Sequence, residues 1–537
     1  MIRINELRLE LDDEEEILKL KAAKILKVNT KYIESISIFK KSIDARNKAD
    51  VHFKYSVDVF VSLDENQIVR KCKNPRVQIV TPYVYEMPEN RRTSNLRPII
   101  VGFGPAGMLA GLILAEAGLR PIILERGPNV EQRQRDVKLF WQKRILNEES
   151  NVQFGEGGAG TFSDGKLNTG IKSPFIRKVL LEFVEAGAPE EILYSAKPHV
   201  GTDRLGVMVK NIRKKIERLG GEVRLLCKLE NLIVYNGHVQ GVTCSQNGET
   251  TDIEADTVIL AIGHSARDTV EMLYNLGVNI EQKAFSVGAR IEHPQKLINK
   301  TQYGPFANHP KLGPADYKLS CHSLHERGAY TFCMCPGGTV VAAASEKGGV
   351  IVNGMSTLAR DGENANSALL VGIEPKDFNS THPLAGIEIQ RGIEEKAFKI
   401  AGGDYRAPAQ LVGDFLNHKK STALGAVRPT CPTGVTLTEL DECLPQKTCL
   451  TMRSAIVEMD KKLNGFNLYD AVLTAPETRS SSSVRILRDD ILQCNIRGVY
   501  PCGEGAGYAG GIVSSAVDGI KCAHAILNNE SDFNTFK

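Results

Sequence analysis

The stretch RPIIVGFGPAGMLAGLILAEAGLRPIILERG, residues 97–127, decides the fold. Its apolar start predicts a strand, which Gly102, Gly104 and Gly107 follow, and a helix and a second strand complete the unit. In this pattern the first glycine permits a tight turn, the second admits a pyrophosphate close to the backbone, and the third lets helix and strand pack. Glu125 ends the second strand and can accept ribose hydroxyls. The stretch therefore predicts a Rossmann-type dinucleotide site.

Three further glycine-containing stretches indicate which dinucleotide binds. Residues 151–170, NVQFGEGGAGTFSDGKLNTG, have a glycine density that suits backbone lying against a flat ring, and residues 257–264, TVILAIGH, end a buried strand. Residues 499–519 place Glu504 after a strand and open a helix at Gly511, whose positive end can face a flavin. NAD and FAD share the βαβ unit, but only a flavin needs additional chain around a ribityl group and a tricyclic ring. We therefore expect FAD.

The expected FAD contacts come from these stretches and from the strand that holds Leu229. They are Gly102, Gly104, Pro105, Ala106, Gly107, Glu125, Arg126, Gly157, Gly158, Gly160, Thr161, Lys166, Leu229, Ala261, Gly263, Gly503, Glu504, Gly511 and Ile512. Lys166 has two interpretations, because it can place positive charge beside a reduced flavin or lie on the surface.

Composition and length limit the class of protein. A chain of 537 residues exceeds the size at which one core usually stops growing, so several domains are expected. A net charge of +3, from 67 basic and 64 acidic residues, argues against nucleic acid or an anionic membrane as an obligatory partner. The sequence shows no signal peptide and no apolar run of about 18 residues. Because its twelve cysteines lack framework spacing, we expect a cytoplasmic protein.

The order of segments predicts an α/β protein in three domains. We expect a small N-terminal α+β module at 1–90, followed by a polar linker. A Rossmann-like FAD-binding domain is expected to be assembled from the discontinuous segments 96–284 and 478–537. An inserted α+β domain at 285–477 is expected to cover the substrate.

The N-terminal module has two interpretations. Its stretch FKKSIDARNK places Lys40, Lys41, Arg46 and Lys48 in one basic turn, which suits a flavin-dependent RNA-modifying or RNA-binding protein. Alternatively, the turn is a solvated face and the module serves docking or oligomerisation.

Several motifs resemble a known family. FGEGGAGTFSDGKL at 154–167, FCMCPGGTVVAAASE at 332–346, NGMS with NANSALLV, and ETRSSSSVRILRD at 477–489 are similar to bacterial FAD-dependent, or NAD(FAD)-utilizing, dehydrogenases. This family is part of the large class of flavoproteins with two dinucleotide-binding domains. In that class a Gly-Asp pair usually binds the ribityl and pyrophosphate region, where this chain has Gly503 and Glu504. The resemblance, which runs through the whole chain, supports FAD without specifying a substrate.

Other polar candidates have both functional and structural interpretations. Cys333 and Cys335 would share one face of a regular strand, as a redox pair or as packing residues. Arg479 and Arg485 could hold a carboxylate or phosphate, or cap the FAD domain. The remaining candidates are histidines: His199, His264, His322 and His325. Their spacing predicts no metal site, although His322 and His325 would share one face of a helix.

Together these features predict an FAD-dependent oxidoreductase, a dehydrogenase or reductase. Hydride would pass between flavin N5 and a small-molecule substrate. Since no second GxGxxG follows a strand, NAD(P)H is expected to bind only transiently.

Overall fold

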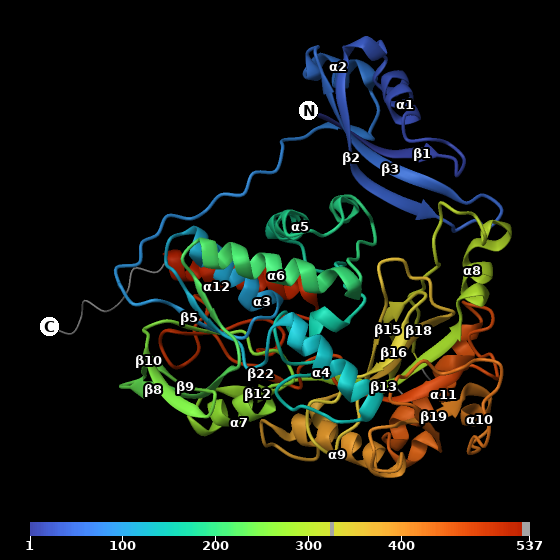
Figure 1. Ribbon diagram of the computed structural model, residues 1–537. Helices are drawn as coiled ribbons and strands as arrows, with labels where there is room; N and C mark the ends of the chain where they lie inside the picture. The colour runs from blue at the N-terminus through green and yellow to red at the C-terminus, as the bar shows by residue number, and fades with distance from the viewer. Residues whose placement is uncertain (323–326, 529–537) are drawn as a thin grey trace.

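The computed structural model describes residues 1–322 and 327–528 and has three main sheets, each with its own helices (Figure 1). A parallel sheet carries the GxGxxG unit, a larger mixed sheet belongs to the following part of the chain, and a small antiparallel sheet forms the N-terminal unit. The predicted α/β fold with a Rossmann-type core is confirmed.

The parallel sheet has the strand order β23-β11-β5-β6-β7. Its strands are β5 (Ile99–Val101), β6 (Ile122–Leu124), β7 (Glu222–Arg224), β11 (Val258–Leu260) and β23 (Val499–Pro501). Because β5 is central, the loop after it opens at the carboxyl edge of the sheet, where such folds bind ligands. The strand β23 returns from the end of the chain, so distant segments meet at this edge.

Helices cover this sheet because its strands are apolar on both faces. The helices of this part are α3 (Pro105–Glu116), α4 (Val130–Lys143), α5 (Phe175–Glu185), α6 (Thr202–Arg218), α7 (Arg267–Asn275) and α12 (Ile512–Asn528). Figure 1 shows α3, α6 and α12 side by side, and α3 contacts both others. A separate antiparallel sheet lies near α7 and comprises β8 (Cys227–Tyr235), β9 (His238–Gln246) and β10 (Glu249–Glu254). An Asn-Gly turn joins β8 to β9, with positive φ at Asn236 and Gly237.

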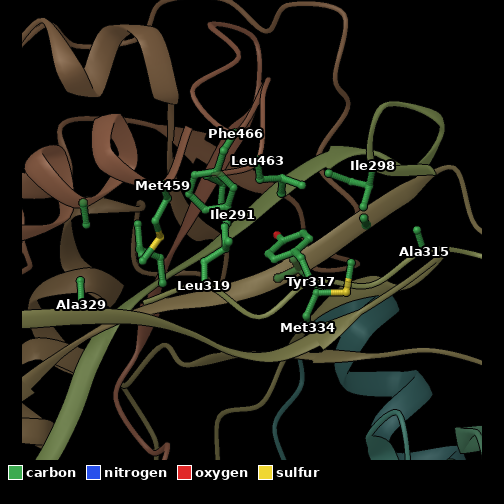
Figure 2. Close-up of a cluster of buried hydrophobic side chains, with 14 of the residues drawn as sticks. Ile291, Ile298, Ala315, Tyr317, Leu319, Ala329, Met334, Met459, Leu463 and Phe466 are labelled. Atoms are coloured by element: carbon green, nitrogen blue, oxygen red, sulfur yellow. The ribbon is translucent and has the colours of Figure 1, made fainter. Parts of the chain in front are cut away.

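The seven-stranded mixed sheet has the order β14-β15-β18-β13-β21-β19-β20. Its strands are β13 (Phe285–Pro294), β14 (Ser320–His322), β15 (Gly328–Cys335), β18 (Asn364–Ile373), β19 (Ala407–Leu411), β20 (Val435–Leu437) and β21 (Val472–Glu477). The accompanying helices and short strands are α8 (Gln295–Tyr303), α9 (Ala385–Ile400), α10 (Val412–Leu416), α11 (Gln446–Asp460), β12 (Ile280–Gln282), β16 (Thr339–Ala342), β17 (Val352–Met355) and β22 (Val484–Ile486). Figure 2 shows the core of this region, where Ile291, Tyr317, Met334 and Phe466 are buried.

The N-terminal unit comprises residues 1–80 and follows a β-α-β-β-α-β order. Its elements are β1 (Ile2–Leu9), α1 (Ile17–Leu26), β2 (Ile33–Asp44), β3 (His52–Val61), α2 (Glu65–Cys72) and β4 (Val77–Ile79). The sheet order β2-β3-β1-β4 leaves β2 and β4 as edges, and residues 81–98 connect the unit to β5 as irregular chain.

Two further expectations concern helices. The prediction that His322 lies on a helix is wrong, because His322 ends strand β14, paired with Gly328; His325 lies outside the described residues. Within residues 1–322 and 327–528, each helix is too short or too polar to cross a bilayer.

Candidate functional site

A cavity of about 830 Å³ opens at the carboxyl edge of the parallel sheet and extends to the mixed sheet. Most of the residues expected to contact FAD line it: Gly102, Gly104, Pro105, Ala106, Glu125, Arg126, Gly158, Gly160, Lys166, Leu229, Ala261, Gly263, Glu504, Gly511 and Ile512. The other four, Gly107, Gly157, Thr161 and Gly503, do not line it. Phe332, Cys333 and Glu477 line the far end, so one space joins the GxGxxG loop to the mixed sheet.

The glycines of the cavity have two distinct roles. A Cβ on Gly102 would lie 2.4 Å from the Ala261 carbonyl oxygen, and one on Gly107 would lie 1.9 Å from the Gly102 carbonyl oxygen. These two positions are glycine because the protein packs against them. In contrast, a Cβ on Gly104 would meet only Gly158 Cα at 3.8 Å, and one on Gly511 would meet nothing within 4 Å. The space beside Gly104 and Gly511 is therefore available to a ligand.

Glu125 connects the two glycine loops. Its buried carboxylate accepts hydrogen bonds from the backbone N–H groups of Phe103, Gly127 and Gly155, each at 2.9 Å. A carboxylate offers about four acceptor positions, so one remains for a ribose hydroxyl. Glu125 thus shapes the site as well as facing the cavity.

Arg126 lines the cavity with its charge already paired. The guanidinium forms ion pairs with Glu149 and Asp268 and lies over the ring of Phe154, 4.1 Å from its centroid. We expect its contribution to FAD binding to come from its aliphatic and planar surfaces, because its N–H groups are engaged.

No pattern in the sequence indicates the role of Arg133. This fully buried side chain of α4 donates hydrogen bonds to five backbone carbonyl groups of the glycine-rich loop: Asn151, Val152, Gly155, Glu156 and Gly158. Burial lowers the pKa of Arg133 to about 10, opposed by Glu125 and Glu156, so the guanidinium stays charged at neutral pH. The loop follows a course that the sequence alone does not specify, and one arginine fixes it.

Lys166 faces the far end of the cavity and is held by Asp164. The Lys166 Nζ lies 2.8 Å from the Asp164 carboxylate, which also pairs with Arg360 and accepts a hydrogen bond from Ser356. Burial alone would raise the pKa of Asp164, but Lys166 and Arg360 outweigh it and hold that pKa well below its usual range. Two cations therefore share one anion, and the cluster has a net positive charge. Of the two interpretations of Lys166, the structure favours a cavity residue over a surface one.

Cys333 and Cys335 do not lie on a regular strand. The register between β15 and β18 shifts between Phe332 and Cys335, and Cys333 has a φ of +45°. Met334 is anchored in the core of Figure 2, and only Cys333 of the two cysteines lines the cavity. The expectation that both side chains share a strand face is wrong, because a β-bulge interrupts the alternation. Burial raises the pKa of Cys333 to about 11, although Lys166 opposes this.

Arg290 and Glu477 form a buried pair behind Cys333. Their side chains are 3.1 Å apart, and Arg290 also donates to the Cys333 carbonyl and to Asn366. Burial raises the pKa of Glu477 despite the charge of Arg290. This pair holds the bulge from behind and places an ionisable carboxyl group at the cavity wall.

Arg479 belongs to a buried ion-pair network and is not free to bind a ligand. Its guanidinium pairs with Glu394 and Glu346 and donates to Ser345, while Arg267 pairs with the same two glutamates. Arg485 is the other arginine of the motif and lies 3.8 Å from Glu281. The structural interpretation of this motif fits better, since the protein supplies the carboxylates itself.

Two further titratable groups of the cavity have strongly shifted pKa values. Burial, together with the charges of Arg479 and Arg267, lowers the pKa of His264 to about 3, so the imidazole is neutral. Burial raises the pKa of Glu504 to about 7, opposed by Lys283. No hydrogen bond reaches the Glu504 carboxyl group from the described residues, which leaves it for a ligand in the cavity.

One cluster of metal-ligating atoms occurs among the described residues. Cys502, Asp518 and Cys522 place theirs within 4.8 Å of one another. Asp518 already pairs with Arg488 and accepts the Gly503 N–H. The absence of a metal stays a prediction.

The basic stretch of the N-terminal unit is partly neutralised. Lys40 and Lys41 lie in β2 and not in a turn, Lys41 pairs with Glu15, and Arg46 pairs with Asp44. No structural observation favours the RNA interpretation.

Comparisons with known proteins identify the class. Residues 284–480 match the family model of the C-terminal domain of FAD-dependent proteins, and residues 1–60 match a domain of unknown function. Together with the cavity, the first match shows an FAD-dependent protein with FAD as its cofactor. An uncharacterized protein of Clostridium beijerinckii is 49% identical over 529 residues, which cover 98% of each chain. The chain belongs to the same family as that clostridial protein.

Solved structures match this chain at low similarity. The flavin-dependent brominase Bmp2 is 12% identical, with a TM-score of 0.38 and coverage of 82% of this chain and 80% of that one. A geranylgeranyl bacteriochlorophyll reductase-like protein from Thermoplasma acidophilum is 14% identical, with a TM-score of 0.34 and coverage of 80% and 77%.

Proposed function

We propose that the protein is an FAD-dependent oxidoreductase, a dehydrogenase or reductase of the NAD(FAD)-utilizing kind, with NAD(P)H as a transient partner. The continuous cavity carries this proposal, because it runs from the GxGxxG loop to Cys333 and Glu477 of the mixed sheet. Bound FAD supplies hydride exchange at its N5 atom.

The residues around the cavity fit FAD. The open sides of Gly104 and Gly511, the remaining acceptor position of Glu125 and the first-turn N–H groups of α3 and α12 would hold its polar groups. Glu504 would accept from, or donate to, the hydroxyl groups of the cofactor according to its protonation state.

The far end of the cavity favours an anionic substrate. Lys166 and Arg360 share Asp164, and the exposed Lys318 adds a further positive charge at the same end. In this proposal Lys166 orients the anion, and the mixed sheet shields the reaction from water. The N-terminal unit has no part in RNA chemistry in this proposal. We also propose a cytoplasmic location, since the twelve free cysteines suit a reducing compartment.

Anaerobic mixing with NADH or NADPH tests the proposal. One of them should bleach the flavin absorption band, and Lys166→Met should slow the bleaching whereas the exposed Lys172→Met should not. Dithionite serves as the control for a reducible flavin. A flavin that dithionite reduces and neither nucleotide does would exclude NAD(P)H as the donor.

A further inference from the structure

We infer that the N-terminal unit supports the wall of the cavity that carries Lys166, and that its docking limits access to Cys333. This goes beyond the proposed function, since it holds for any substrate or electron donor. Three sets of contacts lead to it.

The first set is at the free edge of β2. The Lys41 N–H donates to the Tyr194 carbonyl at 2.7 Å, and the Lys41 carbonyl accepts from the Ala196 N–H at 2.8 Å. Because β2 is an edge strand, these groups are not needed by the ladder to β3. The unit therefore adds its edge to residues 194–196 as a short parallel pairing.

The second set connects residues 194–200 to the cavity wall. The Leu167 N–H donates to the Pro198 carbonyl at 2.9 Å, and Asn168 Nδ2 donates to the Ala196 carbonyl at 3.0 Å. The backbone of Lys166 also pairs with that of His199 in antiparallel orientation. Ala196 thus uses its N–H toward the N-terminal unit and its carbonyl toward a residue of the wall. Displacement of Lys41 would release the outer support of the segment that carries Lys166.

The third set involves the chain after α8. Lys311 donates to the Asp13 carbonyl and to Glu14, each at 2.9 Å. Apolar side chains of the unit form one buried cluster with Tyr303 and Leu312. Figure 1 shows the unit beside α8 and above α5. A few residues after Leu312, Lys318 lines the cavity. Both segments that hold the unit therefore continue into the cavity wall.

Alkylation of Cys333 in the FAD-loaded protein tests the inference. Iodoacetamide labelling, followed by peptide mass spectrometry, measures how often reagent reaches the cavity. Lys41→Pro removes the N–H that binds Tyr194, at an edge position where proline is tolerated. We expect labelling of Cys333 to accelerate by roughly fivefold, the factor that corresponds to one lost hydrogen bond.

Two controls separate docking from other effects. Lys41→Ala keeps the N–H and removes only the side chain that pairs with Glu15. Ile43→Pro changes the next residue of β2 with the same orientation, whose N–H has no docking contact among the described residues. Both should label at the wild-type rate. An unchanged rate in Lys41→Pro, or an equal rise in Ile43→Pro, would overturn the inference.

A second variant applies if Lys41→Pro fails to fold. Asn168→Ala cuts the bridge to Ala196 without touching the N-terminal unit and should also accelerate labelling. Asn211→Ala is the matched control, since Asn211 makes a similar bond to the Ala186 carbonyl away from the cavity. Equal labelling of these two variants would reject the inference.

Discussion

Arg133 occupies the space that a side chain at Gly155 would need. A Cβ built on Gly155 lies 2.5 Å from Arg133 Cδ, and the guanidinium of the same arginine donates to the Gly155 carbonyl. Gly155 also has a φ of +117°, which few other residues adopt. The position of Arg133 therefore requires glycine at position 155. Through this contact, helix α4 fixes the loop that lines the cavity.

Removal of Arg133 should loosen this loop and weaken FAD binding. Arg133→Met leaves five carbonyl groups without their donor, four of them buried, which should cost at least about 3 kcal/mol of stability. Denaturant unfolding of the apoprotein and fluorescence titration with FAD measure the two effects. Arg135→Met, two residues further along α4 and exposed, is the control and should change neither. Wild-type affinity in Arg133→Met would mean that the loop holds itself.

Gly104 and Gly107 should respond differently to the same substitution. Gly104→Ala fits the apoprotein, because its Cβ meets only Gly158 at 3.8 Å, but it fills space beside the first turn of α3. We expect unchanged stability and an FAD dissociation constant raised about tenfold, from a phosphate contact worth 1–2 kcal/mol. Gly107→Ala should instead destabilise the apoprotein, since its Cβ collides with the Gly102 carbonyl. Equal behaviour of the two variants would contradict this division of roles.

These cases show which parts of the site are local in sequence. The strand, the glycines and Glu125 lie within about thirty residues and obey a fixed spacing, so the pattern predicts them. No such pattern identifies Arg133. Arg135 is the same residue type on the same helix, and the environments of the two arginines differ only because a loop folds back over α4. The position of Cys333 is not local in sequence either, because the β-bulge beside it accompanies the burial of Met334 in the core of the mixed sheet.

The sequence alone does not predict the partners of Arg479 either. An arginine beside four serines suggests an anion site, but Glu394 is 85 positions away in the chain and reaches Arg479 only in the fold. Local chemistry indicated what Arg479 can bind, and the fold determined what it does bind.

Glu394 should be essential for the stability of this buried network. Burial alone would raise its pKa, but Arg479 and Arg267 lower the pKa to about 2. Glu394→Gln leaves two buried guanidinium groups under-compensated and should cost about 3–5 kcal/mol. Thermal and urea unfolding measure the loss. Glu388→Gln is the control, since Glu388 forms an exposed pair with Arg391, and it should cost less than about 1 kcal/mol.

Glu504 should make the apoprotein less stable as pH rises. Its pKa is about 7 in the folded protein and near 4.5 when unfolded, so between these values the folded state binds the extra proton. The free energy of unfolding should therefore fall between about pH 5 and 7.5, by up to 2–3 kcal/mol before screening by water in the cavity. Glu504→Gln should flatten this part of the profile. A parallel profile in the variant would show that Glu504 does not titrate there.

A negative charge at the start of α12 should lower the flavin reduction potential. Gly510 lines the cavity next to this helix, and a Cβ there meets nothing within 4 Å. It suits the test better than Gly511, whose φ of +139° would add strain to any substitution. The carboxylate of the Gly510→Asp variant would offset the positive end of α12 and repel the negative charge that reduction adds to the flavin. We expect it to make reduction less favourable by about 1–2 kcal/mol, which corresponds to about 20–40 mV for two electrons. Gly510→Asn has nearly the same shape without the charge and should leave the potential within about 10 mV. Potentiometric titration of both variants against the wild type decides the matter. If Asp and Asn shift the potential equally, the start of α12 does not act on the flavin through its charge.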